Sequence, residues 1–209
     1  MPDQRILSFQ PRSATARILL NYARIDRFGN AVAVTTTING AYGSKVYVEE
    51  AGFFLNNEMD DLSAKAGKPN MFGLIGAEAN SIEPEKRMLS SMTPTIIEKD
   101  GRLKMVVGSP GGSRIITSVL QNILNVIEFD MGMQESVSAS RFHHQWLPDR
   151  IIFEKDFDTL PFSDLRAKGY HIQRSARNGL GKVDAILVLD DGRLEGGADP
   201  RGDDRASGY

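Results

Sequence analysis

Two groups of residues in the middle of the chain have types and spacing suited to binding a negative charge. Ser90 and Ser91 place two hydroxyls side by side, and Gly111 and Gly112 lie between a predicted strand and a predicted helix. Glycines can turn neighbouring N–H groups into one cleft, as an oxyanion hole or a phosphate nest requires. A strand-to-helix turn that needs glycine for its geometry alone would show the same pair, so both interpretations stay open.

A cluster of acids and amides, residues 56–61 (NNEMDD), lies upstream of these groups. A metal site is disfavoured because no histidine is near in sequence and calcium loops space their ligands further apart. Asn56 and Asn57 could instead cap a turn whose acids are solvated. The third interpretation is an acid clamp for a ligand ammonium. A ligand that carries both an ammonium and an anionic group is an α-amino acid.

The histidine pair does not add a catalytic or metal site by this reasoning. His143 and His144 are adjacent, and neighbours on an extended chain point to opposite sides. One packed and one exposed histidine beside Trp146 is therefore favoured over a shared metal. No arrangement resembles a Ser/His/Asp triad.

The elements that must position these groups can be read from the pattern. Strands over residues 95–99 and 102–107 flank Asp100-Gly101, a pair typical of a tight hairpin turn. The second strand leads into the glycines, and a helix begins where they end. Its apolar residues recur at three- and four-residue steps and predict one broad buried face: Ile115, Ile116, Val119, Leu120, Ile123, Leu124 and Ile127.

The remaining elements follow in order along the chain. Strands over 17–26 and 31–37 read as a hairpin, followed by a polar loop over 37–44 and short strands at 45–48 and 52–55. Residues 63–87 have no period and read as a long loop, which in compact domains is often a lid. We then expect a helix over 134–139, a strand over 150–154, a helix over 161–168, and strands over 183–189 and 193–197. This order predicts an α+β sandwich of sheets covered by helices.

Composition excludes several classes of protein. With 209 residues and 41% hydrophobic content, one domain is expected. The net charge of −2 leaves no basic surplus for nucleic acid. The chain has no cysteine, which excludes disulfides and thiol nucleophiles. No apolar run is long enough to span a membrane, and the polar start is unlike a signal peptide, so the chain as written is expected in the cytoplasm.

Five motifs together resemble the small, C-terminal subunit of the γ-glutamyltranspeptidases, also called glutathione hydrolases. They are residues 29–39 (GNAVAVTTTIN), 55–61 (LNNEMDD), 89–94 (LSSMTP), 108–112 (GSPGG) and the tail from 199–201 (DPR) to 208–209 (GY). The resemblance covers about residues 26–209. It implies part of a four-layer αββα sandwich of the N-terminal-nucleophile hydrolases. Family members are commonly periplasmic or extracellular.

The resemblance also implies a mechanism and a role for each matching residue. An N-terminal threonine freed by self-cleavage attacks the γ-glutamyl carbonyl, with its own amine as base, and water or an acceptor amino acid resolves the acyl-enzyme. No cofactor or metal is expected. Thr37 would hold the nucleophile's hydroxyl, and the oxyanion hole would come from Gly111 and Gly112. The other implied roles are ammonium binding for Asn39, Glu58 and Asp61, carboxylate binding for Ser90 and Ser91, and an aromatic lid for Phe72.

The chain departs from the family where the nucleophile should be. The position of the catalytic threonine, eleven residues before Asn30, holds Leu19, which has no hydroxyl. The family's large subunit, expected as a partner unless the chain self-associates, is absent from this sequence. Residues 1–18 read as a leader unlike the family, ahead of a single domain over 19–209. We therefore expect an inactive isolated chain, and the alternatives are a gene fragment or a non-catalytic module that binds glutamate.

Overall fold

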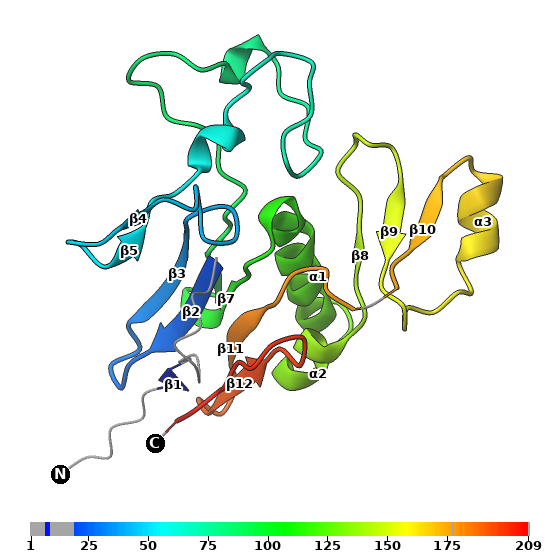
Figure 1. Cartoon of the computed structure of the whole chain (residues 1–209). Helices are drawn as coiled ribbons and strands as arrows, with labels where there is room; N and C mark the ends of the chain where they lie inside the picture. Colours follow the sequence, from blue (N-terminus) through cyan, green and yellow to red (C-terminus); the bar gives the residue numbers. More distant parts are fainter. Residues whose placement is uncertain (1–6, 9–18, 177, 209) are drawn as a thin grey trace.

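The computed structural model describes residues 7–8, 19–176 and 178–208. Its centre is a four-stranded antiparallel sheet in the order β12-β11-β7-β6, of which β7, β11 and β12 are labelled in Figure 1. The strands are β6 (Thr95–Lys99), β7 (Arg102–Gly108), β11 (Asp184–Val188) and β12 (Leu194–Ala198). A second antiparallel sheet, β1-β2-β3, packs against β7 and β11; it consists of β1 (Leu7–Ser8), β2 (Leu19–Ile25) and β3 (Ala31–Thr37).

Both hairpins expected from the sequence are present. In the β6–β7 turn Asp100 and Gly101 have φ of 53° and 71°, the left-handed pair that a two-residue hairpin turn needs. In the β2–β3 turn the Asp26 carboxylate accepts from the backbone N–H groups of Phe28 and Asn30, at 2.8 and 2.9 Å. These local contacts fix both registers. The β2–β3 ladder runs from Leu19 opposite Thr37 to Ile25 opposite Ala31.

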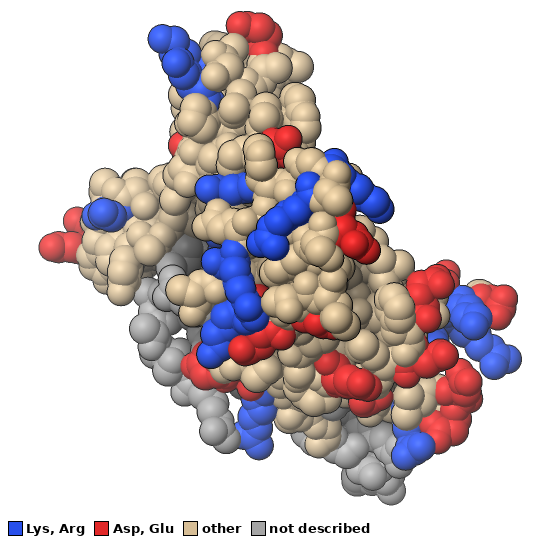
Figure 2. Space-filling model, turned by 90° about the vertical axis from the view of Figure 1, so that its right-hand side faces the viewer, with Lys and Arg blue, Asp and Glu red and all other residues tan. Residues whose placement is uncertain are grey.

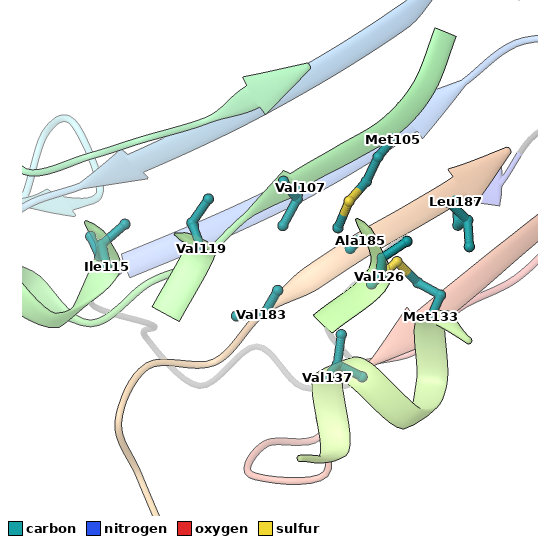
Figure 3. Close-up of a cluster of buried hydrophobic side chains, with 10 residues drawn as sticks. All are labelled: Met105, Val107, Ile115, Val119, Val126, Met133, Val137, Val183, Ala185 and Leu187. Carbon is teal, nitrogen blue, oxygen red and sulfur yellow. The ribbon is translucent and has the colours of Figure 1, made fainter. Parts of the chain in front are cut away.

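Two apolar cores lie on the two faces of the central sheet. Between the sheets, Ala23 and Ile25 pack against Val106 and Ile186. On the other face, two helices cover the sheet: α1 (Ile115–Ile127) and α2 (Met133–Ser138). Figure 3 shows this larger cluster, which contains Met105, Val107, Ile115, Val119, Val126, Met133, Val137, Val183, Ala185 and Leu187.

The predicted buried face of α1 is wrong for the residues on one side of its apolar stripe. Ile115 and Val119 are buried, but Ile116, Leu120, Leu124 and Ile127 are exposed. The stripe that faces the sheet instead includes Ser118 and Asn122. These two polar residues can be buried because both are hydrogen-bonded: Ser118 donates to the Leu180 carbonyl at 2.8 Å, and Asn122 accepts from Ser136 at 3.0 Å.

A third sheet and a helix form a separate lobe, at the right of Figure 1. Its strands are β8 (Phe142–His143), β9 (Ile151–Phe153) and β10 (Ile172–Arg174), in the order β10-β9-β8. Helix α3 (Phe162–Ala167) packs its buried Phe162 against Phe153. The strand expected at 150–154 and the helix expected at 161–168 are confirmed in shorter form. The strands β8 and β10, of two and three residues, were not predicted.

The segment between β3 and β6 has little regular structure. Strands β4 (Tyr47–Val48) and β5 (Phe53–Phe54) pair as a hairpin that is shorter than predicted. Residues 63–87 form a long loop, as expected, which contains the 3-10 turn η2 (Glu78–Asn80). Two further 3-10 turns, η1 (Glu58–Asp61) and η3 (Gly112–Arg114), belong to the site described below.

The layer order is helices, central sheet, second sheet, which is three of the four layers of the expected sandwich. On the outer face of the second sheet, Tyr22 and Val32 are 42% and 47% exposed. In the described part of the chain no helix covers this face (Figure 1). Of the expected leader, only Leu7 and Ser8 are described, and they pair with Ile25 and Arg24 of β2.

The surface agrees with the near-neutral net charge. Figure 2 shows basic and acidic side chains occurring together across one face of the molecule. Within the described ranges, no helix is both long and apolar enough to cross a membrane.

Candidate functional site

Eight of the nine predicted site residues line one cavity of about 280 Å³. They come from four parts of the chain: the end of β3, turn η1, the long loop with the segment after it, and the turn between β7 and α1. Glu58 is the exception, because it lies on η1 but does not line the cavity. The eight residues are Thr37, Asn39, Asp61, Phe72, Ser90, Ser91, Gly111 and Gly112.

The glycine turn has a backbone that only glycine adopts easily. Gly111 and Gly112 have φ of 148° and 59°. The Ser91 hydroxyl donates to the Gly112 carbonyl at 3.1 Å, which joins the serine segment to the turn. A Cβ on Gly111 would lie 3.0 Å from the Gly181 Cα, so the turn is also packed tightly from behind. Geometry and packing both require glycine here, whatever the turn binds.

The loop after β3 is held to the acid cluster by amide side chains. Asn39 has a φ of 68°, and its N–H donates to the Thr37 hydroxyl at 2.8 Å. Its side chain donates to the Asn57 carbonyl at 3.2 Å, and the Asn57 side chain accepts from the Gly40 N–H at 2.7 Å. These bonds bring the end of β3 and turn η1 to the same side of the cavity.

The acid cluster combines two of the interpretations drawn from its sequence. Asn56 accepts from the Glu58 N–H at 3.0 Å, a local turn contact of the kind that the structural interpretation expects, but Asn57, at the N-cap of η1, makes no capping hydrogen bond with its side chain. Asp61 instead lines the cavity. Burial and the neighbouring charge of Asp60 raise the pKa of Asp61, and burial and the charge of Asp61 raise that of Glu58. A carboxylate with a raised pKa lacks a compensating cation, which a ligand ammonium would supply.

Phe72 closes the cavity over the glycine turn. A Cβ on Gly112 would lie only 2.7 Å from the Phe72 ring, so the ring rests directly on this glycine. The loop around Phe72 is attached to the acid cluster through Asp60, whose carboxylate accepts from the Met71 N–H at 3.0 Å. Nowhere in the described ranges do three His, Asp or Glu side chains gather as metal ligands.

Leu19 lies at the edge of this site by strand register. Its backbone pairs with Thr37, which lines the cavity. The position that the resemblance assigns to the nucleophile is therefore beside the cavity. The residue there offers no hydroxyl.

Sequence reasoning missed a polar cluster next to the cavity. His143 is buried, and its ring bonds to the Thr117 hydroxyl and the Gln145 side chain, each at 2.8 Å. Burial lowers the pKa of His143. His144 is half-buried and Trp146 is exposed, close to the packed-and-exposed pair that was expected. The two-residue spacing of His143 and Gln145, which faces both toward one side, was the available signal.

A buried ionic network holds the tail behind the glycine turn. Arg141 and Arg201 both pair with Asp199, at 2.7 and 3.0 Å, and Arg201 also pairs with Glu154. Glu154 accepts from the N–H groups of residues 179 and 180, and Asp199 accepts from the Val183 N–H. The motif at 199–201 thus orders the segment that packs against Gly111.

Two facing sheets, with helices on the outer face of one and this cavity at the ends of β3 and β7, define an N-terminal-nucleophile hydrolase fold. The family model for gamma-glutamyltranspeptidase matches residues 20–209, and the chain belongs to this family. The Escherichia coli (strain K12) glutathione hydrolase proenzyme is 48% identical over 190 residues, 90% of this chain and 32% of that protein. The Pseudomonas aeruginosa proenzyme is 46% identical, over 87% of this chain and 33% of its own length.

Solved structures agree with the family. A Helicobacter pylori gamma-glutamyltranspeptidase T380A mutant is 52% identical with a TM-score of 0.82, over 87% of this chain and 98% of that chain. The Pseudomonas nitroreducens enzyme complexed with L-DON is 43% identical with a TM-score of 0.79, over 92% and 97%. The chain spans about a third of the length of the curated relatives it matches.

Proposed function

We propose that this chain supplies the γ-glutamyl site for transfer and hydrolysis of glutathione and related γ-glutamyl compounds. The observation that carries the proposal is one cavity that gathers an acid, Asp61, two hydroxyls, Ser90 and Ser91, and the Gly111-Gly112 turn. An amino-acid head group would place its ammonium at the acid and its carboxylate at the hydroxyls. Its γ-carbonyl would then extend toward the glycine N–H groups.

Each residue has a distinct role in this proposal. Asn39 and Asp61 hold the ammonium, with Glu58 acting from outside the cavity through its charge. If position 19 carried a hydroxyl nucleophile, Thr37 would orient that hydroxyl. The N–H groups of the two glycines stabilise the oxyanion of the tetrahedral intermediate. Without a hydroxyl at position 19 no acyl-enzyme forms, so the chain by itself does not turn over substrate.

The proposed partner is a large subunit of the same family. The chain spans about a third of its curated relatives, and the outer face of its second sheet exposes Tyr22 and Val32. Obligate interfaces bury roughly 2,000 Å² or more, enough to cover such a face. Self-association through this face is the alternative. We propose residues 19–209 as the domain that docks; Leu7 and Ser8, from the expected leader, pair with its strand β2.

A second candidate function is a non-catalytic module that binds glutamate or γ-glutamyl compounds. Leu19 favours it, because the structure keeps the cavity beside a position that has lost the nucleophile. Both candidates predict binding. They differ in whether a large subunit, together with a nucleophile introduced at position 19, produces turnover.

Calorimetry of the full chain with L-glutamate and glutathione tests the site. We expect binding that Asp61→Asn abolishes and that Glu98→Gln, an exposed acid on β6, leaves unchanged. Binding that Asp61→Asn does not weaken would show that the ammonium is held elsewhere. Cleavage of γ-glutamyl p-nitroanilide is then measured with the chain alone. Turnover above a protein-free blank that Gly111→Ala abolishes would mean that another residue serves as nucleophile.

A further inference from the structure

The side chain of Gln145 joins three parts of the molecule next to the cavity. Its oxygen lies 2.8 Å from the Ser113 hydroxyl and 2.8 Å from Nε2 of His143. Its nitrogen donates to the carbonyls of Phe72 and Leu147, each at 3.2 Å. A primary amide has two N–H donors and an oxygen that accepts twice. All four positions of this amide are occupied.

These partners leave only one orientation for the amide. Carbonyls only accept, so the NH₂ group must face Phe72 and Leu147, and the oxygen must face Ser113 and His143. His143 therefore carries its proton on Nε2. Its Nδ1 then accepts from Thr117, and this 2.8 Å contact is shorter than the alternative from the Thr117 hydroxyl to the Arg114 carbonyl at 3.2 Å. The network is fully determined by its chemistry.

The loop that Gln145 holds is stiff at its tip. The Asn70 side-chain oxygen accepts from the N–H groups of Phe72 and Leu74, both at 3.0 Å. The Asn70 N–H donates to the Leu74 carbonyl at 2.9 Å, and Gly73, with φ of 77°, closes the turn. Residues 70–74, here called the lid tip, therefore move as one unit. Their position depends on what attaches them to the rest of the protein.

Gln145 is the attachment on the side of the glycine turn. On the side of the acid cluster the lid tip is attached through Asp60, and the Asn57 side chain also donates to the Met71 sulfur at 3.7 Å. Ser113 directly follows Gly112, on which the Phe72 ring rests, so Gln145 connects the lid tip to the segment that it covers. Gln145 and His143 also line two neighbouring cavities of about 460 and 270 Å³, so no packed core backs the lid tip here.

We propose that Gln145 is a positioning residue that holds the lid tip closed over Gly112 and thereby sets the rate at which a ligand leaves the cavity. The fixing of the lid tip stands on the contacts alone. Its effect on a γ-glutamyl ligand rests on the proposed function. Gln145 does not touch the cavity itself.

Hydrogen exchange of the ligand-free full chain tests the first part. Gln145→Leu removes all four bonds, whereas Gln145→Glu keeps the acceptor toward Ser113 and His143 but cannot donate to Phe72. We expect both variants to raise exchange at the lid-tip amides about tenfold, the effect of losing one to two hydrogen bonds. Gln173→Leu, an exposed glutamine on β10, is the control and should change nothing. Unchanged lid-tip exchange in both variants would overturn the proposal.

Dissociation of L-glutamate, followed by stopped-flow, tests the second part. Both variants should release the ligand about tenfold faster. The association rate should change much less than the dissociation rate. General destabilisation of the fold would not produce this difference between the two rates. Equal dissociation rates for all chains would overturn the proposed control of release. Absence of glutamate binding in the unaltered chain would overturn the proposed function instead, and the exchange experiment would then decide the role of Gln145 on its own.

Discussion

Replacing Gly112 by alanine should push the Phe72 ring off the glycine turn. The added Cβ would lie 2.7, 2.9 and 3.2 Å from three ring atoms, where ordinary contacts begin at 3.4 Å. The ring must therefore shift by several tenths of an ångström or swing away. Overpacking of this kind costs about 1–3 kcal/mol. The φ of 59° adds about 1–2 kcal/mol for a residue with a side chain.

Chemical denaturation can separate these two costs. Gly101→Ala is the matched control, because Gly101 has a φ of 71° and a Cβ added there would meet nothing within 4 Å, so this variant carries only the backbone cost. We expect Gly112→Ala to destabilise by about 1–3 kcal/mol more than this control. In a Phe72→Ala background the excess should disappear, since no ring remains to clash.

Two outcomes would refute this reasoning. Equal costs for Gly112→Ala and Gly101→Ala would mean that the ring does not rest on the turn. An excess that persists in the Phe72→Ala background would mean that the clash involves other atoms. Glutamate binding, measured in the unaltered chain and in each of these variants, should fall only where the Phe72 ring is displaced or removed.

Three further predictions concern charge and surface. Since the pKa of Asp61 is raised, the unfolded chain releases this proton first, so the contribution of this carboxyl to stability falls as pH rises between its two pKa values; Asp61→Asn should remove that contribution, measured as the difference between the denaturation curves of the two chains. Asp199→Ala leaves the buried guanidinium of Arg141 without its partner and should cost about 3–5 kcal/mol, seen as a lower Tm. The isolated chain should associate in light scattering, and Tyr22→Lys with Val32→Lys should reduce the association.

Each of these predictions has a control. Asp191→Ala removes an exposed pair with Arg193 and should lower the Tm far less, so a similar loss at both aspartates would contradict the role of burial. A monodisperse monomer with a sharp melt would contradict the predicted association. The pH dependence is judged from the difference between the unaltered chain and Asp61→Asn, and an unaltered chain that gains stability relative to this variant as pH rises would contradict the sign of the Asp61 shift.

Local chemistry accounts for the parts of the fold that the sequence predicts well. The Asp100-Gly101 and Asp26-to-Asn30 turns hold their hairpins by contacts within a few residues, so both could be found without the rest of the molecule. The face of α1 could not. Its period is compatible with either half of a wide apolar stripe, and the choice depends on Ser118 and Asn122, whose burial needs partners far away in sequence.

In the candidate site, too, some residues could be predicted from the sequence and others depend on contacts between distant parts of the chain. Thr37, Asn39 and the paired serines could be named because their motifs resemble a family, and the structure brings them to one cavity. Glu58 was named with Asp61 because they share one short turn, but only Asp61 faces inward. For Gln145 the available signal was only its two-residue spacing from His143, which does not indicate a contact with the lid tip. The importance of Gln145 comes from a long loop that folds back onto it across more than seventy residues, as its contact with Phe72 shows.

Under the proposed function, the antiparallel ladder that ends at Leu19 and Thr37 also bears on what a nucleophile at position 19 would require. In this chain the nitrogen of residue 19 belongs to a peptide bond, whose lone pair is delocalised into the carbonyl and cannot accept a proton. A hydroxyl introduced by Leu19→Thr would therefore sit beside the cavity without a base. Breaking the bond between residues 18 and 19 would free an amine, but beside an aliphatic side chain. Leu19→Thr and cleavage of the bond before residue 19 must therefore be combined in one molecule. The substitution alone supplies the hydroxyl without a free amine, and the cleavage alone supplies the amine without a hydroxyl.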